Sequence, residues 1–104
     1  MKATSAYGLH SPYLYRLYRE VLFARMPRRQ RQHLGLRTKQ DELLYKLNRS
    51  LPPESFVFMY HPHRQEERWQ RLCAMPHATA CIDLYHSGIV LFNPKLSKQH
   101  ILLR

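Results

Sequence analysis

Hydrophobic residues in the first half of the chain recur at helical spacing, in two blocks separated by a polar segment. The first block follows Ser11 and Pro12, a pair that favours a helix start because serine caps exposed amides and proline fits the first helical position. Its apolar positions recur every three or four residues until Pro27, which predicts a one-sided helix of about four turns. The second block predicts a helix over residues 39–49, because residues 38–41 resemble a capping box and two prolines follow the last leucine.

The second half of the chain has the pattern of short strands around one helix. The run of five apolar residues at 56–60 predicts a buried strand, since it is too short for a core helix. Two glutamates then open the amphipathic segment 66–76, which predicts a short helix that covers the sheet. Residues 79–85 alternate between apolar and polar, and a turn at 86–88 leads into a last apolar strand, 89–92.

These elements predict an α/β fold in a single domain, residues 1–104. Two N-terminal helices precede a strand, a helix, a strand and a strand, and the strands form a small mixed sheet. The length of 104 residues suits one small domain, and an apolar fraction of 44% indicates a folded core. Residues 1–51 form a basic helical half and residues 52–104 a βαββ half.

Positive charge is concentrated in the first half of the chain. The formal net charge is +10, and residues 1–50 contain eleven lysines and arginines against three acidic residues. The segment 28–39 has five cations and no acid, so it is the candidate polyanion-binding site, with a solvated connection between helices as the alternative. The five residues are Arg28, Arg29, Arg31, Arg37 and Lys39. The tyrosines of the preceding helix are expected mostly on its apolar side, which gives little support to base stacking.

Histidines and cysteines form no recognisable metal site in the sequence. His61 and His63 are the closest pair among seven histidines, but the other candidates lie on different predicted elements, so we predict no metal ligands. Cys73 and Cys81 have no second cysteine at ligand spacing, which favours a reduced, cytoplasmic setting over a disulfide framework. No segment is long and apolar enough to predict a membrane span.

Both ends of the chain resemble one enzyme family. The N-terminal stretch Gly-Leu-His-Ser-Pro-Tyr, residues 8–13, and the C-terminal sequence ATACIDLYHSGIVLF followed by KLSKQHILLR carry this resemblance. They are similar to the two ends of a bacterial subgroup of class I S-adenosylmethionine-dependent methyltransferases. The resemblance implies that the last strand lies between the other two, and that Asp83, within the second strand, has a structural role.

The resemblance also implies that the cofactor-binding middle of the family is missing from this chain. The family binds S-adenosylmethionine at a glycine-rich turn followed by an acidic residue, whereas this chain has three glycines and no Gly-x-Gly. The acidic residues that end the matching family strand are replaced by a His-Pro-His sequence, residues 61–63. We therefore predict no cofactor-binding residues, assign no catalytic residues and expect the chain not to be an enzyme by itself.

Two functions follow from these patterns. The first is a truncated methyltransferase-like protein that lacks the S-adenosylmethionine site and acts as a noncatalytic binding or regulatory module, with a full-length methyltransferase relative or a second copy of the chain as partner. The second is a small basic RNA-binding or ribosome-associated protein. A methyltransferase completed by a partner chain is a weaker alternative. Loss of the middle opens an edge at residues 56–60, which we expect the N-terminal helices to cover or a homodimer to pair.

Overall fold

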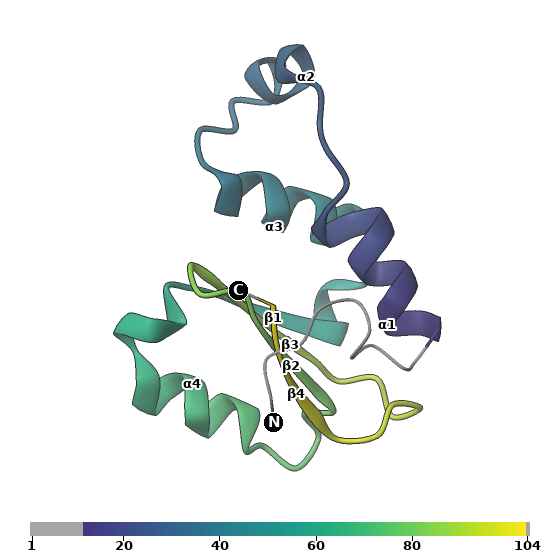
Figure 1. Ribbon diagram of the computed structural model, residues 1–104, viewed down its shortest axis with the longest axis vertical. Coiled ribbons are helices and arrows are strands. Elements are labelled where there is room, and N and C mark those ends of the chain that lie inside the picture. Colours follow the sequence, from purple (N-terminus) through teal and green to yellow (C-terminus); the bar gives the residue numbers. More distant parts are fainter. Residues whose placement is uncertain (1–11, 104) are drawn as a thin grey trace.

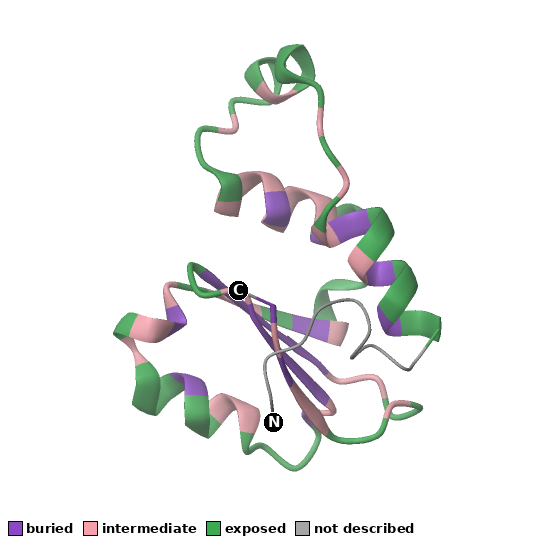
Figure 2. Cartoon of the chain, viewed as in Figure 1, coloured by how far each residue is buried: buried purple, intermediate pink, exposed green. Residues whose placement is uncertain are grey.

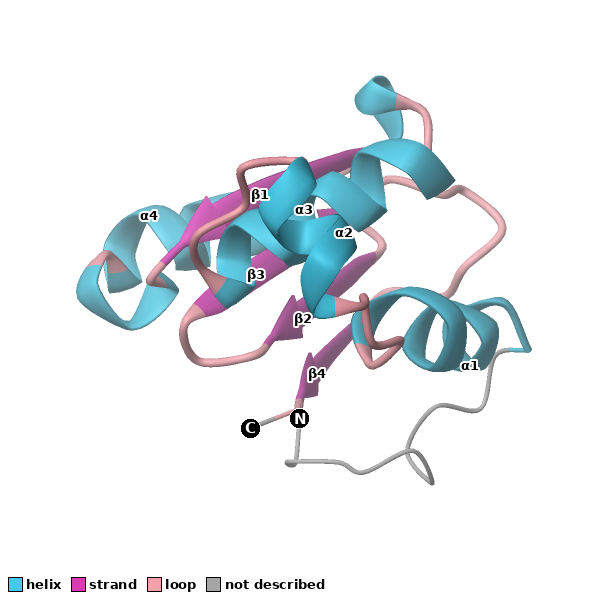
Figure 3. Ribbon diagram, turned by 90° about the horizontal axis from the view of Figure 1, so that it is seen from above, coloured by secondary structure: helices cyan, strands magenta, loops and turns pink. Residues whose placement is uncertain are grey.

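The computed structural model describes residues 12–103 as a four-stranded mixed sheet with helices on both faces (Figures 1 and 3). The α-helices are α1 (Pro12–Leu17), which continues as the π-helix η2 (Tyr18–Leu22), α2 (Arg28–His33), α3 (Lys39–Ser50) and α4 (Glu66–Cys73). Two 3-10 turns, η3 (Pro53–Ser55) and η4 (Pro62–Arg64), flank the first strand. The strands are β1 (Phe56–Tyr60), β2 (Ala80–Asp83), β3 (Ser87–Leu91) and β4 (Gln99–Leu102). The predicted α/β class is confirmed, and none of the described helices is both long enough and apolar enough to cross a membrane.

The strand order is β1-β3-β2-β4. β3 pairs antiparallel with both β1 and β2, so the last predicted strand does lie between the other two. β4 was not predicted, and it makes the sheet mixed by running parallel to β2. Its pattern is weak in the sequence because Gln99 and His100 are polar and half-buried, while Ile101 alone is deeply buried.

Side chains alternate between two buried faces of the sheet, as the period of a strand requires. Most residues of the strands are buried or half-buried (Figure 2). One face packs against α1, η2 and α3, and the other against α4 (Figure 1). Each aliphatic side chain buried in this way stabilises the fold by roughly 1.5–3 kcal/mol. The larger cluster includes Leu14, Leu17, Val21, Leu43, Leu47, Ile82, Ile89 and Ile101, and the smaller one Trp69, Ala78, Cys81 and Val90.

The first helix is shorter than predicted. It ends at Leu22 instead of continuing to Pro27, and its last turn widens into η2, where the Phe23 amide donates to the Tyr18 carbonyl at 3.1 Å. Tyr13 and Tyr15 are exposed, so the expectation that the tyrosines lie mostly on the apolar side was wrong. The proposed cap, Ser11, and the motif before it lie outside the described residues.

The turn between β2 and β3 also differs from the prediction. Gly88 belongs to β3, and the left-handed residue of the turn is Tyr85, with φ of 72°. The Tyr85 amide donates to Oδ1 of Asp83 at 2.7 Å, and the Leu84 amide donates to the Ser87 carbonyl at 2.8 Å. Asp83 is buried and supports the turn, in agreement with the structural role implied for it.

β1 forms one edge of the sheet. Ser55 and His61, on either side of it, are hydrogen-bonded to the β3 side. The alternation of an antiparallel ladder therefore points the amides and carbonyls of Phe56, Phe58 and Tyr60 away from β3. α3 packs against one face of this strand, but its edge has no backbone partner among residues 12–103. The expected cover of the edge by the N-terminal helices is therefore wrong for the described residues, and pairing in a homodimer stays a prediction.

Candidate functional site

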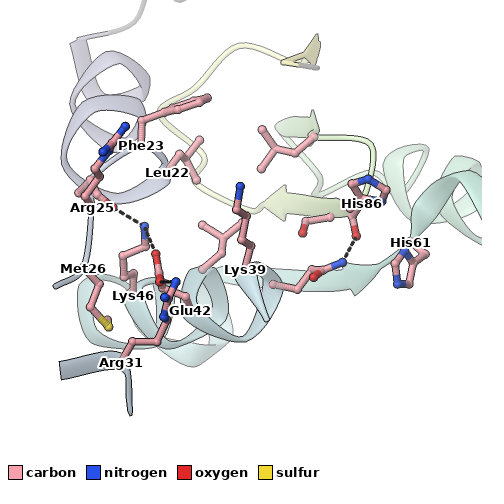
Figure 4. Close-up of a pocket in the computed structure, with 15 residues that line it drawn as sticks. Leu22, Phe23, Arg25, Met26, Arg31, Lys39, Glu42, Lys46, His61 and His86 are labelled. Carbon is pink, nitrogen blue, oxygen red and sulfur yellow. Dashed lines mark hydrogen bonds and ion pairs between the residues drawn. The ribbon is translucent and has the colours of Figure 1, made fainter. Parts of the chain in front are cut away.

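A cavity of about 900 Å³ opens between the first helix, α3 and one end of the sheet (Figure 4). The end of η2 and the loop at residues 23–26 form one wall, and the first two turns of α3 form another. The third wall consists of His61, after β1, and the turn between β2 and β3. The cavity therefore joins the basic helical half of the chain to the βαββ half.

Glu42 holds two cations on one side of this cavity. Its carboxylate lies 3.6 Å from Nη1 of Arg31 and 3.8 Å from Nζ of Lys46 (Figure 4). The Lys46 ammonium also donates to the Ala24 carbonyl at 2.7 Å, which ties α3 to the loop after η2. Desolvation lowers the pKa of Lys46, and the attraction of Glu42 only partly offsets it. This network fixes the wall of the cavity, and Glu42 is the only acidic residue of the described part of the chain that lines it.

The rim of the cavity carries further positive charge. Arg25 and Lys39 line it, and neither makes an ion pair with any residue from 12 to 103. Phe23 lies beside them with 53% of its surface exposed (Figure 4). An aromatic ring next to unpaired cations is the combination that binds single-stranded nucleic acid through stacking and phosphate contacts.

The five predicted polyanion-binding residues lie on or beside α2. Arg28, Arg29 and Arg31 are in this helix, Arg37 is in the loop between α2 and α3, and Lys39 opens α3. Only Arg31 and Lys39 line the cavity. α2 has no buried residue and projects from the rest of the molecule (Figures 1 and 2). The structure thus brings two of the five residues to the cavity and leaves the other three on the exposed helix α2 and the loop after it.

Three histidines lie together at the end of the sheet, namely the pair His61 and His63 and also His86, which the sequence placed on a different element. Their candidate ligand nitrogens all fall within 4.8 Å of one another. The rings of His61, His63 and His86 have centroids 5.7–5.8 Å apart, and each pair is nearly perpendicular. His61 and His86 also line the cavity (Figure 4).

The backbone around the histidines is held in strained conformations. His61 has φ of 51°, a left-handed value that is costly for a residue with a side chain. Its amide and the Gln40 side chain both donate to the His86 carbonyl, at 2.8 and 3.4 Å. Desolvation lowers the pKa of His61, and the positive charge of Arg64 adds to the effect.

Sequence reasoning missed Arg25, Lys46 and the histidine cluster. The signal for the cluster was the pair His61 and His63, but the third member depends on strand register, because the pairing of Tyr60 with Ser87 brings His86 alongside. No spacing rule along the chain shows that contact.

Comparisons with protein-family models, with curated proteins and with solved structures find no match to this chain. The resemblance to methyltransferases accordingly remains a prediction from the two terminal motifs.

Proposed function

We propose that this protein is a noncatalytic, methyltransferase-like binding module whose ligand is single-stranded RNA. The observation that carries the proposal is the basic arm, which we define as residues 23–39. It presents exposed cations and an exposed phenylalanine at the mouth of the cavity.

The charge of the arm supports a phosphate ligand. Four of its five candidate cations, all except Arg31, make no ion pair with residues 12–103. α2 buries nothing, so its arginines do not stabilise the core. Phosphates would neutralise these charges and release counterions, which is the main source of affinity in such complexes.

The aromatic residues near the arm support a single strand over a duplex. Phe23 is exposed and its ring lies 4.4 Å from that of Tyr18. Tyr15 is also exposed, with the Arg19 guanidinium 5.8 Å from its ring. Unpaired bases stack on such rings irrespective of sequence, whereas paired bases are not accessible to them.

The methyltransferase-like part of the proposal rests on topology and sequence together. The order β1-β3-β2 is the one that the family resemblance implies, and the chain has no Gly-x-Gly turn for the cofactor. Titration with S-adenosylmethionine should leave the backbone amide resonances of the labelled protein unchanged. Saturable shifts around the cavity would instead support an enzyme with a rebuilt cofactor site.

A cytoplasmic location fits the two thiols. Cys73 and Cys81 are free and in contact with each other. A hydrogen bond between them and desolvation raise the pKa of the Cys73 thiol. Two adjacent thiols stay reduced in the cytoplasm but are prone to pair in an oxidising compartment.

A protein partner is the second candidate function, and the open edge of β1 favours it. An exposed strand edge can pair with a strand of a full-length methyltransferase relative or of a second copy. RNA is the first candidate because the arm supplies both charge and stacking, whereas the edge supplies backbone groups alone.

The test is an RNA titration of the purified protein at several salt concentrations, followed by fluorescence anisotropy of a short labelled single strand. The RNA association constant K falls as the salt concentration rises. Replacing Arg28, Arg29, Arg37 and Lys39 with glutamine should make the slope of log K against log salt concentration less steep by up to roughly 3, because each phosphate contact contributes about 0.7. Phe23→Ala should weaken binding with little change in slope, by about 1–3 kcal/mol for one stacked base.

The matched control removes the same charge from elsewhere. Arg49, Arg68, Arg71 and Lys95 lie at the far end of α3, on α4 and in the loop before β4. Their replacement with glutamine should leave most of the affinity and slope intact. Equal losses in both variants would show that binding follows net charge alone and would overturn the assignment to the arm.

A further inference from the structure

The histidine cluster has the composition and position of a metal site. His61, His63 and His86 place three imidazoles at the corners of a near-equilateral triangle, with ring centroids 5.7–5.8 Å apart. Imidazole is a preferred ligand of Zn²⁺, Cu²⁺ and Ni²⁺, and three histidines with a fourth open position are an established zinc arrangement.

The hydrogen bonds around the cluster select the ligand atom of His63. Its Nδ1 lies 2.9 Å from the Tyr85 carbonyl, which can only accept, so this nitrogen carries the proton. Its Nε2 therefore keeps a free lone pair. A backbone carbonyl that orients a ligating histidine in this way is the usual outer contact of a metal site. The Tyr85 amide is fixed in turn by Asp83.

His61 adds an independent observation. Its Nδ1 is a buried nitrogen without a hydrogen-bond partner among the described residues. A buried polar nitrogen normally has a partner, because desolvation without one is costly. The strained backbone of His61 holds the ring in this place, and such strain occurs mostly at functional sites.

We propose that His61, His63 and His86 together bind one divalent transition metal ion, and that this ion is Zn²⁺. Tetrahedral zinc needs ligand nitrogens about 3.4 Å apart, given Zn–N distances near 2.0–2.1 Å. In the structure the candidate ligand nitrogens lie within 4.8 Å of one another. Rotation of side chains, for which the exposed His86 has room, shortens these distances to the value that zinc needs. The fourth position belongs to water. This inference does not rest on RNA binding.

Arg64 provides a sharp test of charge. It follows His63 in the chain, and its positive charge acts on His61. A cation bound at the cluster would be repelled by it, so Arg64→Gln should tighten metal binding severalfold. Arg71→Gln, which removes an equal charge at the end of α4, should leave the affinity unchanged.

The experiment uses the untagged chain, freed of metal with a chelator and titrated with Co²⁺ and then Zn²⁺. We expect one equivalent of Co²⁺ to give the intense visible absorption of a tetrahedral site, and Zn²⁺ to displace it. The variants His61→Asn, His63→Gln and His86→Gln should each weaken binding at least 10-fold. Asparagine is chosen at position 61 because it tolerates left-handed backbone.

The control variants are His33→Gln and His77→Gln, which remove exposed histidines outside the cluster. They should bind metal as the original chain does. An octahedral Co²⁺ spectrum of the original chain, or equal losses in cluster and control variants, would overturn the proposal. The Co²⁺ spectrum of the original chain tests the proposal even if a cluster variant fails to fold.

Discussion

Gly88 lies within β3 and not in the turn before it. Glycine is required there because the Trp69 side chain approaches its backbone closely. A Cβ atom at this position would lie 2.6 and 2.8 Å from two ring atoms of Trp69, far inside normal contact distance. Trp69 belongs to α4 and is buried between this helix and the sheet, so its ring has little room to move. Gly35 differs, because its φ of 71° demands glycine while the space around it is open.

Alanine at these two glycines should therefore have different effects on stability. Gly88→Ala should lower the free energy of unfolding by about 1–3 kcal/mol through overpacking and shift the environment of Trp69. Gly35→Ala should cost about 1 kcal/mol through backbone strain alone and leave the tryptophan signal unchanged. Urea denaturation followed by fluorescence measures both effects. A neutral Gly88→Ala variant would mean that α4 packs more loosely on β3.

α3 is the element that holds the two halves together. Its first turn has a capping box, in which Thr38 Oγ1 accepts from the Asp41 amide at 3.0 Å and Asp41 accepts from the Thr38 amide at 3.3 Å. The Tyr60 hydroxyl also donates to Asp41 at 3.3 Å, which links the helix to the end of β1. Desolvation acts to raise the pKa of Asp41, but these hydrogen bonds outweigh it and the pKa is lowered.

This carboxylate should make stability depend on acid pH. Because the pKa of Asp41 is lower in the folded chain than in the unfolded one, ionised Asp41 stabilises the fold above its ordinary pKa, and this contribution is lost as the pH falls through the folded value. Asp41→Asn should be less stable than the original chain at pH 7, and the difference should shrink below about pH 4. Urea denaturation across this pH range checks it.

The matched control for that experiment is Glu54→Gln. Glu54 is exposed in η3 and makes no hydrogen bond or ion pair that the structure shows for residues 12–103. Its replacement removes a carboxylate that makes none of the contacts of Asp41. A difference for Asp41→Asn that stays constant across the pH range would show that its capping role does not depend on charge.

At the scale of the whole molecule, the sheet ends at β1 in a row of outward backbone groups. Val57 and Tyr60 are exposed on this strand, and Gln65 is the one side chain among residues 12–103 that reaches this edge, by donating to the Tyr60 carbonyl at 2.9 Å. Proteins rarely leave such an edge without protection, since it can pair with other chains.

Amide hydrogen exchange should show this edge directly. In dilute solution the amides of Val57 and Met59, which face β3, should be protected, while those of Phe56 and Phe58 should exchange fast. Protection of Phe58 that grows with protein concentration would indicate a homodimer paired through β1. Protection that is independent of concentration would contradict the open edge and show that the chain covers it.

The sequence predicts elements whose signals are local. β1 and the start of α3 match their predicted bounds, because an unbroken apolar run and a capping box are complete in a few residues. The sequence missed β4 and the position of the β2–β3 turn, since a half-polar edge strand and a left-handed tyrosine depend on their neighbours in space. The histidine cluster was missed for the same reason, because it exists only once β1 and β3 are in register.

The burial of Trp69 makes the protein its own optical reporter. It is the only tryptophan in the chain, it is 5% exposed, and it lines the same small cavity as His63. Its emission therefore follows the docking of α4 without a label. A paramagnetic ion such as Cu²⁺ near His63 would quench that emission by short-range contact, whereas the closed-shell Zn²⁺ would not.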